Sequence, residues 1–285
     1  MTSTDARESG PRDTSGSGSG GAPASGVGGP TRARIETRTL RQDRWWLYPL
    51  TTFVVFSAFV VYATIRAFMG SRYYDAPYLS PFYSPCLGDC VEGASDFGQP
   101  FSWWPLSAAL IILIFPLGFR MTCYYYRKAY YRSFWLSPPA CGVAEPHAKY
   151  TGESRFPLVL QNVHRWFWYA AVLIGIVLTF DTVLAFRPAE GEPDGIHMGL
   201  GTVLMIVNVV FIWAYTLSCH SCRHIVGGRL RHFSKHPVRY KLWGWVSRLN
   251  QRHATYAWAS LFSIWLVDLY VLLLSSGAFD DPRFF

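Results

Sequence analysis

Five stretches of the chain are both apolar enough and long enough to cross a membrane as helices. A helix needs about 20 apolar residues to span the hydrocarbon core, and the stretches that reach this length cover residues 45–68, 103–124, 164–186, 197–219 and 253–274. Pro105 and Pro116 fall in the second stretch, where proline can kink a helix without breaking it, because neighbouring helices satisfy the freed backbone groups. The pattern predicts an all-α, polytopic membrane protein built as a bundle of five transmembrane helices.

The polar segments between these stretches differ in positive charge, which sets the orientation of a membrane protein. Of the loops, the first holds only Arg72 and the third only Arg187 as basic residues. The basic residues of the other segments are Arg32, Arg34, Arg38, Arg41 and Arg44 in the N-terminal arm, Arg127, Lys128, Arg132, Lys149 and Arg155 in the second loop, and Arg223, Arg229, Arg231, Lys235, Arg239, Lys241, Arg248 and Arg252 in the fourth. We therefore expect the N-terminus inside and the C-terminus outside.

Composition supports the membrane assignment and divides the chain in two. Charged residues make up only 15% of the chain, against roughly 25% in soluble domains. The net charge of +8 lies in alternate loops, so it fits orientation in a membrane and not nucleic-acid binding. Residues 1–40 are rich in Gly and Ser, cannot bury apolar surface, and are predicted to form a disordered cytoplasmic arm before a membrane domain at 41–285.

Two features are expected near the outer surface. Cys86-Leu-Gly-Asp-Cys90 lies in the first outer loop, where an oxidising environment favours a small disulfide loop over a metal site. Asp181 and Asp268 lie in the outer halves of the third and fifth helices. Acids in lipid are costly and usually functional, so each is interpreted either as a proton-handling group or as part of an interhelical hydrogen bond.

An internal repeat relates the second and third helices to the fourth and fifth. The second helix ends with Met121-Thr122-Cys123 and the fourth with Leu217-Ser218-Cys219, while His164 and His253 stand at the start of the third and fifth. Parallel repeats of this kind are normally related by a pseudo-twofold axis along the membrane normal. The two cysteines and two histidines are therefore expected at one depth, near the inner interface.

Two Cys and two His at one depth suggest a metal centre. Zinc accepts this set in a tetrahedral site, and a Rieske-type [2Fe–2S] cluster takes two Cys on one iron and two His on the other. Haem b is a further alternative, with His164 and His253 as axial ligands and both cysteines unused. Other candidate donors are Cys222, His220, His224, Cys141 and His147. For a single Cys or His in a membrane helix, simple packing or a local hydrogen bond is the ordinary role.

The five-helix plan, the Thr122-Cys123 and Ser218-Cys219 pairs, His164 and His253, and the basic inner face resemble the single membrane subunit of type F succinate dehydrogenases (respiratory complex II). The resemblance covers roughly residues 40–285. It implies a multi-pass protein of the bacterial cell (inner) membrane that docks a flavoprotein and an iron–sulfur protein on its inner face. It also implies a membrane-embedded Rieske-type [2Fe–2S] cluster, with Cys123, Cys219, His164 and His253 as ligands, and electron transfer from succinate to a quinone.

A quinone needs an apolar slot and a few polar groups at its carbonyls. Tyr124, Arg127, His220 and Arg223 follow the two cysteines and are predicted to supply those groups, although Arg127 and Arg223 are also suited to anchoring helix ends at lipid headgroups. The competing hypothesis of another class is a cofactor-free transporter or structural membrane protein. Gly-interrupted helices at matching places would favour transport, and only Gly199-Leu200-Gly201 has that character.

Overall fold

The computed structural model describes residues 41–87, 107–143, 146, 153–156, 158–188, 193–228 and 230–285. Their elements, in chain order, are α1 (Leu47–Met69), β1 (Tyr74–Asp75), β2 (Tyr78–Leu79), α2 (Ala109–Ile112), α3 (Ile114–Thr122), α4 (Tyr124–Phe134), the 3₁₀ helix η1 (Leu158–Val163), α5 (His164–Leu184), α6 (Leu200–Leu217), α7 (His220–Gly227), the 3₁₀ helix η2 (Phe233–Lys235), α8 (Pro237–Asn250) and α9 (His253–Ser275). The expected arm at 1–40 lies outside the described residues.

Within the described residues, four helices are long and apolar enough to cross a membrane. They are α1, α5 together with η1, α6 and α9, and their bounds lie within a few residues of four predicted spans. Helices α2–α3 and α4 become a fifth candidate span only if the bent pair is counted as one. The all-α membrane bundle is therefore confirmed, with four to five spanning helices.

The second predicted span was wrong as a continuous helix over 103–124. Of its described part, α2 ends at Ile112 and α3 begins at Ile114, and the helix axis then turns by 78° between Thr122 and Tyr124. The first interruption follows from Pro116, which has no N–H to donate to the carbonyl of Ile112 and whose ring crowds that carbonyl. The second lies at Cys123, whose backbone is extended (φ −67°, ψ 130°).

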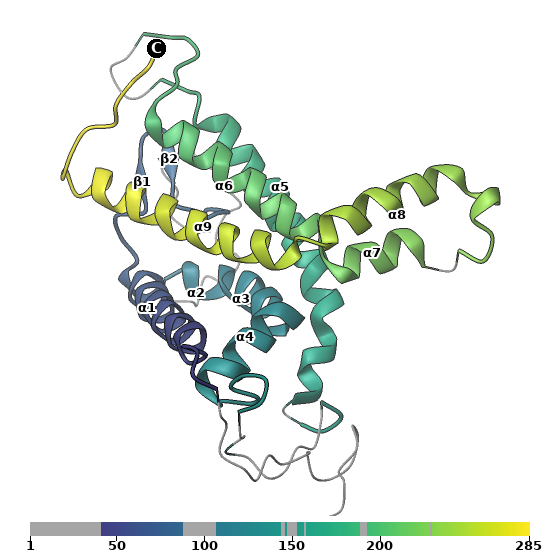
Figure 1. Ribbon diagram of the computed structural model, residues 1–285. Coiled ribbons are helices and arrows are strands. Elements are labelled where there is room, and N and C mark those ends of the chain that lie inside the picture. The colour runs from purple at the N-terminus through teal and green to yellow at the C-terminus, as the bar shows by residue number, and fades with distance from the viewer. Residues whose placement is uncertain are drawn as a thin grey trace, which may run out of the picture.

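Helix α9 is the central element of the bundle. It packs along α6 and also contacts α4 (Figure 1). Its buried face carries small and apolar side chains such as Ala257, Ser260 and Leu261, which allow neighbouring helices to approach closely. Helix α5 packs against both α3 and α6, and α1 packs against α4.

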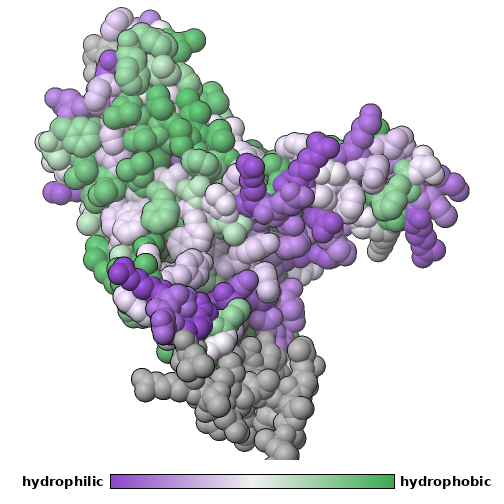
Figure 2. Space-filling view, viewed as in Figure 1, coloured by the Kyte–Doolittle hydropathy of each residue, from purple (hydrophilic) through white to green (hydrophobic). Residues whose placement is uncertain are grey.

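Basic residues gather at one end of the bundle. Helix α4 turns away from α3, and α7 and α8 pack together as an arm that projects from the bundle (Figure 1). Hydrophilic side chains cover this arm, whereas hydrophobic side chains cover the bundle beside α6 and α9 (Figure 2). We call the end that carries α4, α7 and α8 the basic end, and we call the end with β1 and β2 the hairpin end.

The hairpin end is fastened by polar contacts to helices. Ser80 donates to Asp268 and Ser84 donates to Asp181, while Tyr78 donates to Asp281 over 2.7 Å and so ties the hairpin to the C-terminal segment. The hydrogen-bonding interpretation of Asp181 and Asp268 is thus the one that the geometry supports. Cys86 forms a disulfide, and its expected partner Cys90 lies outside the described residues.

Asp268 has a partner that the sequence did not reveal. Arg66 of α1 forms a salt bridge with it, with Nε 2.8 Å from one carboxylate oxygen and Nη2 3.1 Å from the other. The side chains are 1% and 0% exposed. Such a bidentate, charge-assisted pair joins α1 to α9 and leaves neither charge unpaired in the apolar region.

Breaking this pair from one side should destabilise the protein strongly. Asp268→Leu leaves the Arg66 guanidinium buried without a counter-ion, and loss of one partner of a buried ion pair costs about 3–5 kcal/mol. We expect a clearly lower thermal midpoint for the purified complex. The control is the double variant Arg66→Met with Asp268→Leu, which removes both charges and should recover much of the loss; equal instability of the two variants would contradict the explanation.

The orientation of the bundle stays a prediction, and it can be tested at the last residue. Because the positive charge gathers at the basic end, a reporter that is active only outside the cell should be active when fused after Phe285. The same reporter fused before Met1 should be inactive. An inactive C-terminal fusion of a correctly inserted protein would reverse the assignment.

Candidate functional site

The two cysteines of the repeat occupy equivalent backbone positions. Cys123 follows α3 and is the N-cap of α4, and Cys219 follows α6 and is the N-cap of α7. Both have extended backbone conformations, with ψ of 130° and 145°. Each side chain therefore points back toward the bundle at a level where one helix stops and the next begins, and each is only 1% exposed.

The four predicted ligand residues come together as two crossed pairs. Nε2 of His164 lies 3.1 Å from Sγ of Cys219, and Nε2 of His253 lies 3.5 Å from Sγ of Cys123. Each pair joins one repeat to the other, because His164 follows Cys123 in the first repeat and His253 follows Cys219 in the second. The geometry supports the repeat and the expected common depth of the four side chains.

The residue before each cysteine holds the histidine of its own repeat. Oγ1 of Thr122 lies 2.7 Å from Nδ1 of His164, and Oγ of Ser218 lies 2.7 Å from Nδ1 of His253. Both hydroxyl hydrogens are directed to backbone carbonyls, those of Gly118 and Tyr215. The oxygens therefore accept Nδ1–H from the imidazoles, which leaves an Nε2 lone pair facing each thiol. This is the tautomer of an imidazole that binds a metal through Nε2.

Aromatic rings complete the symmetry. Phe119 stacks on His164 with centroids 4.9 Å apart, and Tyr215 stacks on His253 with centroids 5.0 Å apart. Each aromatic residue stands four positions before its cysteine. Sequence reasoning matched the Thr-Cys and Ser-Cys pairs but missed Phe119 and Tyr215. The shared spacing of aromatic residue, hydroxyl residue and Cys in both repeats is the signal that could have identified them.

A cavity of about 450 Å³ connects this site with the basic end. It is lined by the four Cys and His side chains, Thr122, Tyr124, Arg127, His220 and Glu153, among others. Arg127 is paired with Glu153 and lies over the ring of Tyr124. His220 also lines the cavity, where burial of the ring and the charge of Arg223 lower its pKa.

Arg223, the fourth predicted quinone contact, does not line the cavity. Its Nε donates to Ser247 over 3.0 Å, and its guanidinium lies over the ring of Trp243. It fastens α7 to α8, which is close to the helix-anchoring alternative raised from the sequence. The geometry therefore brings Tyr124, Arg127 and His220 together but leaves Arg223 aside.

Of the alternative donors, His220 lines the same cavity as the crossed pairs, and the other described ones do not. Cys222 is buried but does not line the cavity, His224 contacts Arg165, and Cys141 is exposed with its carbonyl bonded to Arg41. His147 lies outside the described residues. Among the residues that the structure describes, no three Cys, His, Asp or Glu side chains converge on one point for a single metal ion.

One buried hydroxyl group in the site lacks a hydrogen-bond partner among the described residues. The phenol O–H of Tyr215 has no hydrogen-bond partner of good geometry in the described part of the chain, yet it lies beside the thiol of Cys123. A buried hydroxyl without a partner is uncommon. A metal-bound thiolate at Cys123 is a stronger acceptor than a thiol, so this atom, the two thiols and the two Nε2 lone pairs together fit an iron–sulfur centre.

The chain is similar to known proteins over most of its length. The family described as actinobacterial succinate dehydrogenase subunit SdhC matches residues 47–277. A chain of the Mycobacterium smegmatis Sdh1 complex in the apo form is 56% identical, with 92% of this chain and 99% of that chain covered and a TM-score of 0.80. No curated protein matches significantly. Since the family match extends over most of the sequence, this protein belongs to the actinobacterial SdhC family of succinate dehydrogenase membrane subunits.

Proposed function

We propose that this subunit anchors succinate dehydrogenase in the membrane and passes electrons from an iron–sulfur subunit to quinone through a Rieske-type [2Fe–2S] cluster. Cys123 and Cys219 would bind one iron, and His164 and His253 the other. The observation that carries the proposal is the pair of crossed Cys–His contacts, each with an Nε2 lone pair directed at a thiol.

The donor set favours a [2Fe–2S] cluster over a haem or a single zinc ion. A haem would use His164 and His253 and leave two buried cysteines beside them without a role. A single zinc ion would need the four donors to converge, whereas they meet as two pairs. A Rieske-type centre takes two sulfurs on one iron and two nitrogens on the other, and the pseudo-twofold repeat would relate the two cysteines to each other and the two histidines to each other. The transporter hypothesis is replaced by membership in the succinate dehydrogenase family.

The chain's own residues would prepare the site in three ways. Thr122 and Ser218 fix the imidazoles so that Nε2 faces the centre. Phe119 and Tyr215 cover the rings and exclude water from the side of the membrane. Extended backbone at each cysteine keeps both sulfurs at one level. When bound, a cluster with mixed Cys and His ligands carries one electron at a higher potential than an all-Cys cluster.

The basic end would dock the soluble subunits. Helix α8 and the end of α4 carry exposed aromatic residues, including Tyr240 and Trp245 of α8 and Trp135 directly after α4, next to a high density of Arg and Lys. Aromatic and Arg side chains are the residues that most often anchor protein interfaces. A flavoprotein and an iron–sulfur protein bound here would cover the mouth of the cavity, and an electron would have a short path to the Cys–His site.

Tyr124, Arg127 and His220 would supply polar contacts to a quinone in the cavity. Arg223 would affect the site only indirectly, by holding α7 against α8. This would place the quinone at the inner side of a bacterial cell membrane, because the basic end is assigned to the inside. There, a quinone ring at the cavity would lie within a few ångströms of the Cys–His site.

The ligand assignment is tested by removing both histidines. His164→Ala with His253→Ala should abolish a Rieske-like EPR signal and stop quinone reduction, because one iron loses both protein ligands, while succinate oxidation by artificial acceptors continues. The matched control is His220→Ala with His224→Ala, which should retain the signal. Loss of a haem Soret band in the first variant would identify a bis-His haem instead, and loss of the EPR signal in the control alone would move the metal to α7.

The role of the two hydroxyl residues gives a separate prediction. Thr122→Val removes the acceptor of the His164 Nδ1–H, and loss of such a second contact typically lowers metal affinity or activity about 10- to 100-fold. Iron content and the EPR line shape of the purified complex should change, and Thr122→Ser should restore them. Thr182→Val is the control, because within the described residues that buried hydroxyl bonds only the backbone of its own helix. An unaltered spectrum for Thr122→Val would remove this residue from the site.

A further inference from the structure

A pocket at the basic end lies between the start of α1, one face of α4 and the start of α9. Its volume is about 240 Å³, and its walls include Tyr48 of α1, Lys128 and Arg132 of α4, and Trp258 of α9. Of the residues that line the cavity at the Cys–His site, it shares only Tyr125. We call this hollow the α4 pocket; it is separate from the site described above.

Two cations of the α4 pocket have no counter-charge within the described residues. Lys128 and Arg132 stand four positions apart on α4 and therefore lie on the same face of the helix. Neither side chain has an ion pair or a hydrogen bond to the described part of the chain, and Nε of Arg132 is buried without an acceptor. No Asp or Glu is among the described residues that line the pocket. A buried donor without a partner is uncommon, so the pocket is suited to an anion.

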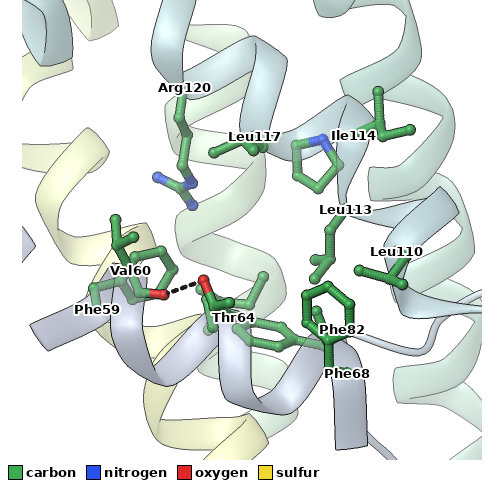
Figure 3. A pocket seen from close by; sticks show the side chains of 14 residues that line it. Phe59, Val60, Thr64, Phe68, Phe82, Leu110, Leu113, Ile114, Leu117 and Arg120 are labelled. Carbon is green, nitrogen blue, oxygen red and sulfur yellow. Dashed lines mark hydrogen bonds between the residues drawn. The ribbon is translucent and has the colours of Figure 1, made fainter. Parts of the chain in front are cut away.

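Other cations nearby differ in this respect. Arg127, on another face of α4, is paired with Glu153. Figure 3 shows the neighbouring hollow between α1 and α2–α3, where the labelled side chains other than Thr64 and Arg120 are apolar. Nη1 of Arg120 donates to Ser260 of α9 over 3.1 Å, so that guanidinium has an acceptor inside the bundle. Positive charge that the described residues leave without an acceptor distinguishes the α4 pocket from both places.

The α4 pocket lies at the level where lipid headgroups are expected. Trp46 and Tyr48, at the start of α1, are exposed, and exposed Trp and Tyr at a helix end mark the membrane–water interface. Helix α4 begins at this level after the 78° turn and leaves the direction of the span. The two cations therefore stand at the edge of the apolar part of the bundle.

A row of exposed apolar side chains continues from the pocket along α9. Trp258 stacks on Phe262, and Phe262, Leu266 and Leu269 are exposed along the same side of the helix. At about 1.5 Å per residue the row from Trp258 to Leu269 is about 16 Å long. This is close to half of a hydrocarbon core about 30 Å thick, which is the depth of one leaflet.

We propose that the α4 pocket binds an anionic phospholipid of the inner leaflet, with its phosphate at Lys128 and Arg132 and an acyl chain along the exposed row of α9. Basic pockets between membrane helices on the cytoplasmic side suit anionic headgroups. A quinone is neutral and would leave both cations without a counter-charge. A carboxylate from a docked subunit would supply the charge but would not use the apolar row. The proposal does not depend on the cluster; it uses only the assignment of the basic end to the inside.

Lipid titration of the intact complex tests the proposal. Once the complex has been stripped of loosely held lipid in detergent, phosphatidylglycerol should raise its thermal midpoint, and phosphatidylcholine, which has no net charge, should raise it much less. Lys128→Gln with Arg132→Gln should weaken the apparent affinity for phosphatidylglycerol about 10- to 100-fold, because two favourable charge interactions are lost. The matched control is Arg231→Gln with Lys235→Gln, which removes the same charge at two exposed positions four residues apart.

Native mass spectrometry of the same complexes counts the bound lipid. One tightly held anionic phospholipid per membrane subunit should be present in the unmodified complex and in the control. It should be absent from the variant at Lys128 and Arg132, while succinate oxidation by artificial acceptors is unchanged. Lys128→Arg keeps both charges and should keep the lipid, which separates loss of charge from misfolding; loss of the lipid in Lys128→Arg would contradict a role for charge.

Four results would overturn the proposal. Equal stabilisation by phosphatidylglycerol and phosphatidylcholine would show that the pocket does not select charge. The same stabilisation by inorganic phosphate would show a site for a free anion and not for a lipid. Loss of the soluble subunits from the variant at Lys128 and Arg132, with its lipid retained, would show a protein-docking site. Equal affinity of this variant and the control for phosphatidylglycerol would remove the two cations from any lipid site.

Discussion

The backbone at Cys123 and Cys219 is extended, and this interrupts two membrane helices at the same level of the bundle. Without those interruptions, α3 and α6 would continue as helices. Cys123 and Cys219 would then lie within a helix and not at a helix N-cap. With them, each sulfur projects from a helix N-cap toward a histidine of the other repeat. The 78° turn after Thr122 also sends α4 away from the bundle axis and so creates the surface of the basic end.

Several polar groups within the apolar part of the bundle have a partner on another element. Arg66 and Asp268 join α1 to α9, Ser84 joins the hairpin end to Asp181 of α5, and Asn208 of α6 accepts a hydrogen bond from Ser263 of α9. In a low-dielectric medium such contacts favour one arrangement of the helices, because burying a polar group without a partner costs free energy. Arg120 of α3 likewise donates through Nη1 to Ala257 and Ser260 of α9.

Hydropathy located α1, α5, α6 and α9 from the sequence because a spanning helix must hide every backbone polar group. The same reasoning joined residues 103–124 into one helix, since hydropathy does not register where Pro116 or an extended cysteine interrupts hydrogen bonding. The Cys and His residues were found by internal comparison, which needs only similar spacing. Arg66 was missed as a partner because an arginine near the end of an apolar stretch looks like an interface anchor, and its counter-ion lies 202 residues away. Phe119 and Tyr215 were missed because aromatic residues are common throughout this chain.

The crossed pairing of the two repeats has a consequence for biogenesis. Neither hairpin contains both halves of a Cys–His contact, and His253 stands at the first turn of the last helix. The donor set is therefore incomplete until α9 has been synthesised, inserted and packed along α6. A cofactor that needs all four side chains could therefore be fully ligated only once His253 of α9 is in place. Completion of the site thus requires α3, α5, α6 and α9 to be in place together.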